Sequence, residues 1–99
     1  MNSQDTRITE SSGNVFLDLG FAPDEVALLS LRAQLMGAVR LWIQTSGLTQ
    51  SEVSARLGIS QSRVSELERG KWDKFSLDML ITLATRAGKK VILELADAA

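Results

Sequence analysis

The side chains with the most specific recognition chemistry in this sequence stand close together between residues 61 and 66. They are Gln61, Ser62, Arg63, Ser65 and Glu66, which combine an amide, two hydroxyls, a guanidinium and a carboxylate. On the outward side of a helix, such groups can hydrogen-bond to the edges of bases: glutamine to adenine, glutamate to cytosine and arginine to guanine, with serine discriminating weakly. Arg63 could also clamp a phosphate, or it could pair with Glu66, three residues away, on a solvated face.

Two lysines beyond this segment could make contacts of a second kind. Lys71 and Lys74 lie in a loop that we predict over residues 71–75. Lysine contacts to phosphate position a protein on nucleic acid without specifying a sequence. Trp72 lies between them, and we expect its ring to pack beneath the loop rather than to touch DNA.

The composition excludes most catalytic and metal-binding chemistry. The 99 residues include no cysteine and no histidine, which rules out disulfides, thiolate or imidazole metal sites, and cysteine or histidine catalysis. Carboxylates and serines are present, but no glycine-rich phosphate loop or assembled catalytic set accompanies them. We therefore expect a protein that is not an enzyme and that carries no metal and no cofactor.

The charge is distributed unevenly along the chain. A net charge of −1 by itself argues weakly against nucleic-acid binding. Residues 1–30 hold five acidic residues against one arginine, whereas residues 31–46 hold two arginines and no acid. Residues 47–74 hold five basic against four acidic residues. The acidic head and the neutral-to-basic middle therefore form different surfaces, and the polar cluster lies in the middle.

The amino-terminal half predicts a tail, an apolar segment and one long helix. Residues 1–13 are polar and are expected to form a flexible tail, whereas the segment Val15–Phe21 must pack on the core as a strand or an extended segment. From about Glu25 to Ser46 the pattern is helical. The apolar stripe of that helix comprises Leu28, Leu35, Val39 and Trp42, widened by Leu29 and Leu31. Gly37 could kink this helix or split it in two.

Residues 49–69 meet the sequence requirements of a helix-turn-helix motif. Thr49 and Glu52 form the signature of a capping box at the start of one short helix, and Ser60 can cap a second. Between the helices, Gly58 tolerates the positive φ that a tight turn needs. The apolar positions that join the two helices are Val53, Leu57, Ile59, Val64 and Leu67. A generic helical hairpin is the alternative interpretation.

The chain beyond the motif predicts one more helix and a strand. Gly70 ends the second motif helix, Ser76 caps a further helix, and Gly88 closes that helix. Its inward face comprises Leu77, Leu80, Ile81 and Ala84. Residues 90–95 predict a short strand, and one strand needs a partner in the chain or in a second copy. The expected fold is all-α, a bundle of four to five helices with a short C-terminal strand.

Residues 48–70 resemble a known family. Their sequence, LTQSEVSARLGISQSRVSELERG, is similar to the helix-turn-helix of the lambda-repressor-like, or Xre, family of DNA-binding domains. The surrounding chain resembles the short antitoxin-type branch of that family, through Val15–Phe21, Phe75–Asp78 and the terminal strand. The resemblance covers about residues 14–95 and implies a lambda-repressor-like bundle in a single domain over residues 14–99.

The resemblance also implies roles for particular residues. The helix Gln61–Arg69 would be the recognition helix, whose first turns enter the major groove of DNA. Gln50 matches a phosphate-contacting position of the family, with its own backbone N–H helping. Glu68 often pairs in this family with an arginine on the first core helix; the equivalent position here looks like Ile43, with Arg40 a turn away.

These features predict a sequence-specific DNA-binding transcriptional regulator, expected to be a repressor that binds double-stranded operator DNA as a homodimer. One recognition helix makes few contacts, so useful affinity calls for two half-sites about 34 Å apart. The antitoxin resemblance implies a second partner, a small mRNA-cleaving toxin, for which the acidic amino-terminal third is a candidate surface. The alternative is a protein-interaction module whose helix-turn-helix no longer binds DNA, which the near-neutral charge favours.

The sequence also predicts where the protein acts. Its first seven residues are polar and lack the basic start and apolar run of a signal peptide. No apolar stretch is expected to reach the length that crosses a bilayer. The predicted location is therefore the cytoplasm, without membrane contact.

Overall fold

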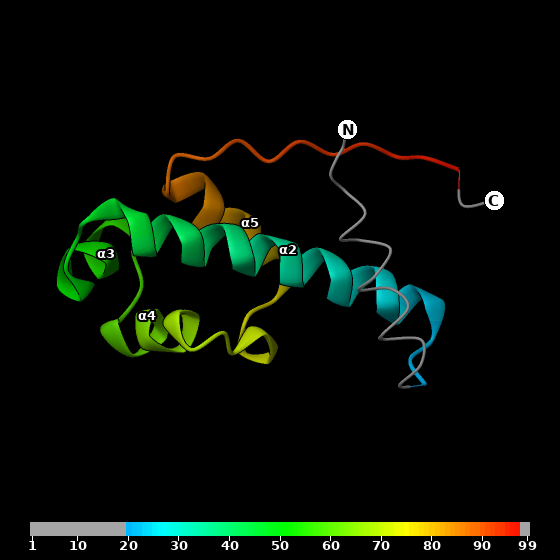
Figure 1. The fold of residues 1–99 in the computed structure, drawn as a ribbon, viewed down its shortest axis with the longest axis horizontal. Helices are drawn as coiled ribbons and strands as arrows, with labels where there is room; N and C mark the ends of the chain where they lie inside the picture. Colours follow the sequence, from blue (N-terminus) through cyan, green and yellow to red (C-terminus); the bar gives the residue numbers. More distant parts are fainter. Residues whose placement is uncertain (1–19, 98–99) are drawn as a thin grey trace.

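Residues 20–97 form an all-helical fold. The structure is a computed structural model that describes these residues; the predicted tail 1–13 and most of the segment Val15–Phe21 lie outside them. The elements are α2 (Pro23–Ser46), α3 (Gln50–Leu57), α4 (Gln61–Glu68), the 3-10 helix η1 (Trp72–Lys74) and α5 (Leu77–Arg86). Figure 1 shows α2 as the long central helix, with α4 below it and α5 behind it. The predicted all-α class is confirmed for the described residues, which contain four α-helices.

Helix α2 is one continuous element. It begins after Ala22, whose backbone N–H donates to the Glu25 carboxylate (2.9 Å), and it runs through Gly37 without a break. Pro23 is the first helical residue, a position where its missing N–H costs no hydrogen bond. The helix ends at Gly47, whose φ of 74° is left-handed, a conformation that glycine adopts readily at the end of a helix.

The buried stripe of α2 is rotated from the predicted one. Val39 is fully buried and Ile43 nearly so, whereas Leu28 is 44% exposed. Apolar residues nearly encircle α2, so spacing alone was compatible with several stripes, and packing against α4 and α5 selects one. Leu35 and Trp42 pack partly buried against the core.

The hydrophobic core lies where α2, α3, α4 and α5 meet. Its fully enclosed side chains are Val39, Val53, Leu57, Val64, Leu67, Phe75, Leu80 and Leu83. The four helical positions predicted for the motif seam are among them, and burying each contributes about 1.5–3 kcal/mol. Ile59 is only partly buried, and Ile81, predicted to face inward, is 36% exposed.

An arginine from another helix caps the C-terminal end of each of three helices. Arg86 donates to the Leu57 carbonyl at the end of α3 (2.9 Å), and Arg40 donates to the Glu68 carbonyl at the end of α4 (3.0 Å). Arg56 donates to the Arg86 carbonyl at the end of α5 (3.1 Å). A guanidinium at such an end satisfies a carbonyl that lacks an intrahelical partner and complements the negative end of the helix dipole. Arg40, Arg56 and Arg86 therefore hold the helices together, and each already has a hydrogen-bond acceptor within the protein.

The predicted C-terminal strand is contradicted within residues 20–97. After α5, the Lys89 N–H donates to the Ala84 carbonyl (2.9 Å), and residues 91–97 then run extended along α2 (Figure 1). A strand exists only through hydrogen bonds to a second strand, and the described part of one chain supplies none. An apolar groove of about 300 Å³ lies beside this segment and is lined by Leu31, Gln34, Leu35, Leu77, Ile81, Val91, Ile92 and Leu93.

Helix α2 corrects the expectation about apolar length. It is long and apolar enough to cross a membrane by length and composition alone, with a mean hydropathy of 1.4 over its most apolar window. The core helix of a soluble protein passes the same test, so one such helix is a weak indication of a membrane span. Part of that window, 33%, is buried inside the bundle.

Candidate nucleic-acid interface

The turn between α3 and α4 is built from local hydrogen bonds. The Thr49 hydroxyl accepts from the Glu52 N–H (3.1 Å) and the Glu52 carboxylate accepts from the Thr49 N–H (2.8 Å), which fixes the start of α3. Helix α3 ends at Gly58, whose φ of 69° is left-handed. The Ser54 hydroxyl donates to the Ile59 carbonyl across the turn. Together these bonds set the direction in which the chain enters α4.

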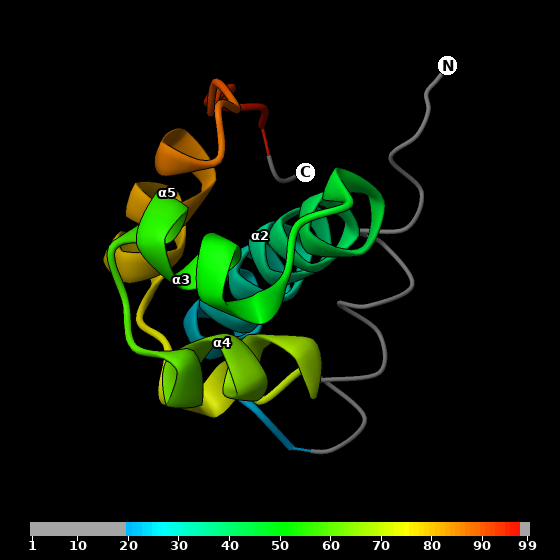
Figure 2. The same cartoon turned by 90° about the vertical axis from the view of Figure 1, so that its left-hand side faces the viewer.

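Helix α4 presents one polar face to solvent. The Ser60 hydroxyl accepts from the Arg63 N–H (3.2 Å) at its start, and Val64 and Leu67 are buried beneath it. By the helical period, the opposite side carries Ser62, Ser65, Glu66 and Arg69. Figure 2 shows α4 at the edge of the bundle, with α2, α3 and α5 all on its other side. The predicted recognition helix is therefore the outermost helix of this side.

The first turn of α4 is available for new hydrogen bonds. Gln61 and Ser62 are exposed, and neither side chain is hydrogen-bonded within residues 20–97. Their backbone N–H groups precede the first intrahelical bond, which the Val64 N–H donates to the Ser60 carbonyl (3.1 Å). Side-chain and backbone donors thus lie together at the positive end of the helix dipole, where base edges and phosphates bind well.

Arg63 is engaged within the protein. Its guanidinium pairs with the Glu66 carboxylate (2.9 Å) and lies over the Phe75 ring, 4.2 Å from the ring centroid. Of the alternatives for Arg63 and Glu66, pairing with each other is the arrangement in the free protein. The two side chains are 35% and 23% exposed, and such a pair contributes about 0–1 kcal/mol. A DNA contact could therefore replace the pair at little cost in free energy.

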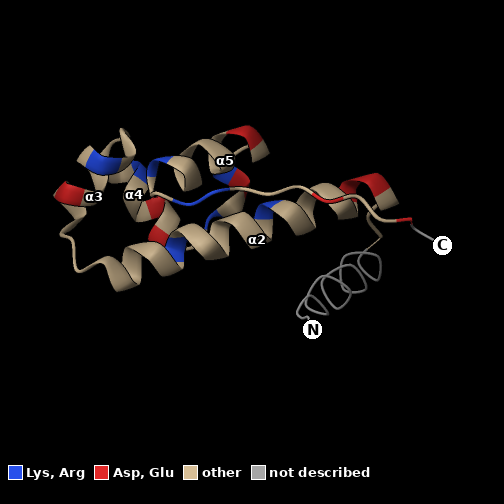
Figure 3. Cartoon of the chain, turned by 90° about the horizontal axis from the view of Figure 1, so that it is seen from above, with Lys and Arg blue, Asp and Glu red and all other residues tan. Residues whose placement is uncertain are grey.

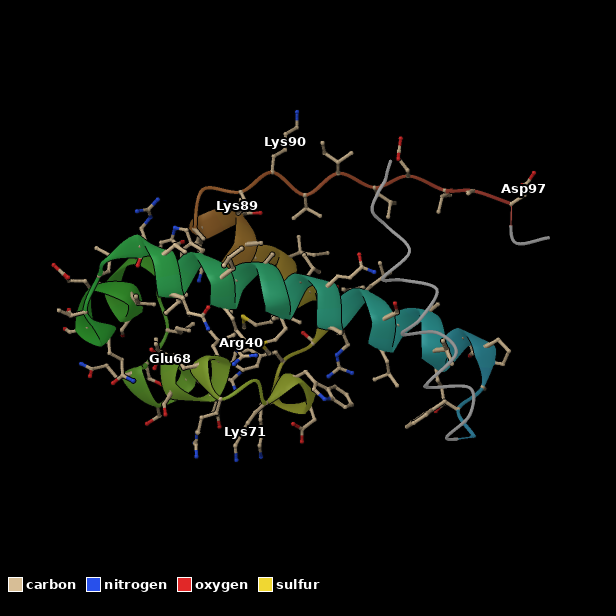
Figure 4. The ribbon with its side chains drawn as sticks, in the orientation of Figure 1. Arg40, Glu68, Lys71, Lys89, Lys90 and Asp97 are labelled. Carbon is tan, nitrogen blue, oxygen red and sulfur yellow. The ribbon has the colours of Figure 1, made fainter. Side chains whose placement is uncertain are left out.

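Gln50 and Glu68 join the two ends of the motif. The Gln50 side-chain amide donates to the Glu68 carboxylate (3.1 Å), while Arg40 reaches the backbone carbonyl of Glu68 (3.0 Å). Figure 4 shows Arg40 and Glu68 between α2 and α4. Arg40 thus contacts Glu68 through the backbone carbonyl alone, and the Glu68 carboxylate, which pairs with an arginine in the family that the chain resembles, bonds Gln50 here. Gln50 itself is exposed at the first position of α3.

The loop after α4 is held by an arginine of α2. Arg32 donates to the Phe75 carbonyl through Nε (3.1 Å) and Nη2 (2.8 Å) and to the Trp72 carbonyl through Nη2 (3.1 Å). The same guanidinium lies over the Trp72 ring, which is 39% exposed and so only partly packed. Lys71 and Lys74 are exposed, and Lys71 points away from the bundle (Figure 4). Arg32 therefore fixes the loop from which both lysines project.

Arg69 is the residue of this face that sequence analysis missed. It is exposed and follows α4 directly. It lies seven residues after Ser62, two helical turns on, so both point to the same side of the helix. That seven-residue spacing was the signal in the sequence that could have identified Arg69.

The face offers hydrogen-bond donors and cations rather than metal ligands. Arg69, Lys71 and Lys74 have no side-chain partner among residues 20–97, and the exposed acid beside them in the loop is Asp73. Within the same residues, no group of three potential ligands could hold a metal ion. Such a surface suits a polyanion with hydrogen-bonding edges, which describes nucleic acid.

Comparison with known proteins agrees with this geometry. A model of the helix-turn-helix domain family HTH_37 matches residues 15–95, a range that includes every predicted contact residue. No curated protein matches the sequence. The family match supports DNA as a partner; the Xre assignment and the antitoxin branch are finer than it reaches.

Proposed function

Because the chain belongs to the helix-turn-helix domain family HTH_37, we propose that it is a sequence-specific DNA-binding regulator that acts as a repressor. The observation that carries the proposal is the first turn of α4. Gln61 and Ser62 project from it exposed and without partners in the described residues, on a helix whose start and end are both fixed. A site that must read base edges needs such groups held rigidly and unoccupied.

The contacts divide into reading and positioning. Gln61 would pair with an adenine, and Ser62 and Ser65 would meet neighbouring base edges, each good bidentate pair contributing about 1–3 kcal/mol of discrimination. Gln50, Lys71 and Lys74 would hold the phosphates on either side of α4. On binding DNA, the ion pair between Arg63 and Glu66 would break. Arg63 would then contact guanine or a phosphate, and Glu66 would contact cytosine.

A homodimer completes the proposed site. Helix α4 has eight residues and reaches only a few base pairs. Two copies on a palindromic operator, with half-sites about 34 Å apart, double the contacts and match the symmetry of the DNA. A DNA-binding role implies a location in the cytoplasm or at the nucleoid.

The test is a selection of binding sites from a random duplex library with the full-length protein, followed by titrations by fluorescence anisotropy. We expect the wild type to select a palindrome. Gln61→Ala should lose about 5- to 150-fold of the preference at one base pair per half-site while keeping non-specific affinity. The control is Gln44→Ala, an exposed glutamine on α2 outside the motif, which should bind as the wild type does. Equal losses in both variants, or no selected sequence, would contradict the proposal.

We further propose that the repressor is an antitoxin that binds a small mRNA-cleaving toxin. Support comes from the resemblance described above and from the acidic amino-terminal third of the chain. Asp24 and Glu25 are exposed at the start of α2, at the opposite end of that helix from α3 (Figure 1). A basic toxin could therefore bind there while α4 holds DNA. Deleting residues 1–22 and replacing Asp24 and Glu25 by lysine should abolish protection of cells from a co-expressed basic nuclease encoded next to this gene, and undiminished protection would contradict this role.

The protein-interaction alternative makes the opposite forecast for DNA. If the helix-turn-helix no longer bound nucleic acid, no duplex would be retained at any salt concentration. Specific binding that weakens as salt rises would exclude this alternative, because release of counterions from phosphates is its signature.

A further inference from the structure

The two tryptophans of the chain differ in what covers them. Trp42 packs partly buried against the hydrophobic core, whereas Trp72 is not among the residues that pack there and is 39% exposed. The indole N–H of Trp72 has no acceptor among residues 20–97. An aromatic side chain that stays partly in water with an unused donor is costly for a free protein and favours a partner that covers it.

The exposed ring of Trp72 is held in one place. The Arg32 guanidinium lies over it, 5.3 Å from the ring centroid, and donates three hydrogen bonds to the carbonyls of Trp72 and Phe75. The Trp72 N–H of the backbone donates to the Gly70 carbonyl (2.9 Å), which closes the turn after α4. A side chain that is already ordered loses little conformational entropy when it binds a partner.

The loop that carries Trp72 lies on the same side of the molecule as the predicted recognition helix. Figures 1 and 2 show η1, the yellow turn after α4, on the same side of α2 as α4 itself. Helix α4 has eight residues and is about 12 Å long, and the major groove of DNA is about 12 Å wide. With the first turn of α4 in the groove, the chain that leaves its last turn is therefore level with the phosphates at the edge of the groove.

Positive charge surrounds Trp72. Arg69, Lys71 and Lys74 are exposed, and one exposed carboxylate in this stretch, that of Asp73, lies among them. Figure 3 shows the lysines and arginines toward the end of the molecule that holds α3, α4 and α5, whereas the first turn of α2 at the other end is acidic. A rigid aromatic ring among cations suits a polyanion that also offers apolar surface.

We propose that Trp72 contacts the sugar–phosphate backbone of DNA and that Arg32 is its positioning residue. The proposal rests on the DNA-binding role of the proposed function and adds a contact to it. The indole N–H donates to a phosphate oxygen, and the exposed edge of the ring packs on a deoxyribose. The guanidinium over the ring is a nearby positive charge that attracts the same phosphate. Because every nucleotide carries these groups, the contact adds affinity without selecting a sequence.

Intrinsic fluorescence tests the contact, because each tryptophan can be observed alone. Full-length Trp42→Phe leaves Trp72 as the only tryptophan, and Trp72→Phe leaves Trp42. When a duplex selected by the wild type is added, we expect the emission of Trp72 to shift to shorter wavelength and its quenching by acrylamide to fall, because the DNA backbone covers the ring. The emission and quenching of Trp42, the matched control, should stay unchanged. Unchanged quenching of Trp72 in a complex that forms would overturn the contact.

Affinity distinguishes the indole contact from the lysine contacts. Trp72→Phe keeps a ring but removes an N–H donor to a charged group, so it should weaken binding about tenfold. It removes no charge, so the slope of log K against log salt should stay the same. Lys71→Ala is the comparison, because loss of a phosphate-binding cation should make that slope shallower by about 0.9. Neither variant should change the selected sequence, and a Trp72→Phe variant that binds as tightly as the wild type would overturn the contact.

A double-mutant cycle tests the role of Arg32. Arg32→Lys keeps the positive charge but cannot make the three hydrogen bonds of the planar guanidinium. In the Trp42→Phe background it should make Trp72 of the free protein more accessible to acrylamide, and in the otherwise native chain it should weaken DNA binding. Combining Arg32→Lys with Trp72→Phe should weaken binding no further than the more damaging single change, because both act through one contact. Losses that multiply would overturn the positioning role.

The same experiments separate this contact from the proposed function. A wild type that selects a DNA sequence while Trp72 stays open to acrylamide refutes the contact and leaves the DNA-binding role standing. A wild type that binds no duplex at any salt concentration refutes both.

Discussion

The side-chain amide of Gln50 donates to the carboxylate of Glu68 at 3.1 Å, joining the first residue of α3 to the last residue of α4. The bond holds Gln50 in one orientation at the surface proposed to meet phosphate. The hydrogen bond from Gln50 links α3 to α4. The hydrogen bond from Arg40 to the Glu68 carbonyl links α2 to α4, so the two motif helices and α2 are held to one another.

Variants at Gln50 and Glu68 should distinguish the proposed phosphate contact of Gln50 from the effect of the negative charge of Glu68 on DNA affinity. Gln50→Ala removes a proposed phosphate contact worth about 1 kcal/mol and should weaken operator binding about fivefold. Glu68→Gln keeps an acceptor for Gln50 but removes a negative charge, so it should tighten DNA binding without lowering stability. Anisotropy titrations at one fixed salt concentration measure both effects. An unchanged affinity in Gln50→Ala would remove this residue from the interface.

Two glycine-to-alanine substitutions should have opposite effects on stability. At Gly58 the φ of 69° is left-handed and an added Cβ would lie 3.1 Å from Arg86 Nη1, so Gly58→Ala should destabilise the fold by about 1–2 kcal/mol or more. Gly37 is helical and exposed, and a Cβ added there would meet no other part of the described structure within 4 Å, so Gly37→Ala should stabilise the fold by up to about 1 kcal/mol. Urea unfolding of the two variants measures the free energies. Equal signs would contradict the turn geometry.

The cap that Arg86 places on α3 should be measurable. Arg86→Met keeps much of the aliphatic stem but leaves the Leu57 carbonyl without its 2.9 Å donor. We expect a loss of about 1–2 kcal/mol, which lowers Tm by about 4–8 °C for each kcal/mol. Arg69→Met, an exposed arginine without a partner in the described residues, should leave Tm unchanged. Comparable losses in both variants would show that the cap contributes nothing specific.

Arg69 should act on affinity rather than on specificity. If it contacts phosphate, Arg69→Ala should weaken binding to all duplexes alike and make the slope of log K against log salt shallower by about 0.9. Lys90→Ala removes an equal charge from the opposite side of the bundle and should leave the slope unchanged. A change in base preference in Arg69→Ala would instead assign this residue to the major groove.

The elements that sequence analysis placed well depend on neighbours along the chain. The capping pair Thr49 and Glu52, the left-handed turn at Gly58 and the cap at Ser60 all appear where the residue types predict them. Each involves groups within four positions of one another, so residue type and spacing contain the necessary information. The expected exposure of Gln61 and Ser62 follows from the same local periodicity.

By itself, therefore, the sequence determined the helix limits, the turn and the polar face of α4. Tertiary structure decided the rest: which side of α2 is buried, which carbonyls Arg32, Arg40 and Arg86 reach, and that Arg63 lies over Phe75. These contacts join residues far apart along the chain, and several geometries satisfy the same local pattern until the helices pack. The chain after α5 is the clearest example. Its residue types predict a strand, but a strand forms only when its backbone is hydrogen-bonded to a second strand, and residues 20–97 supply none.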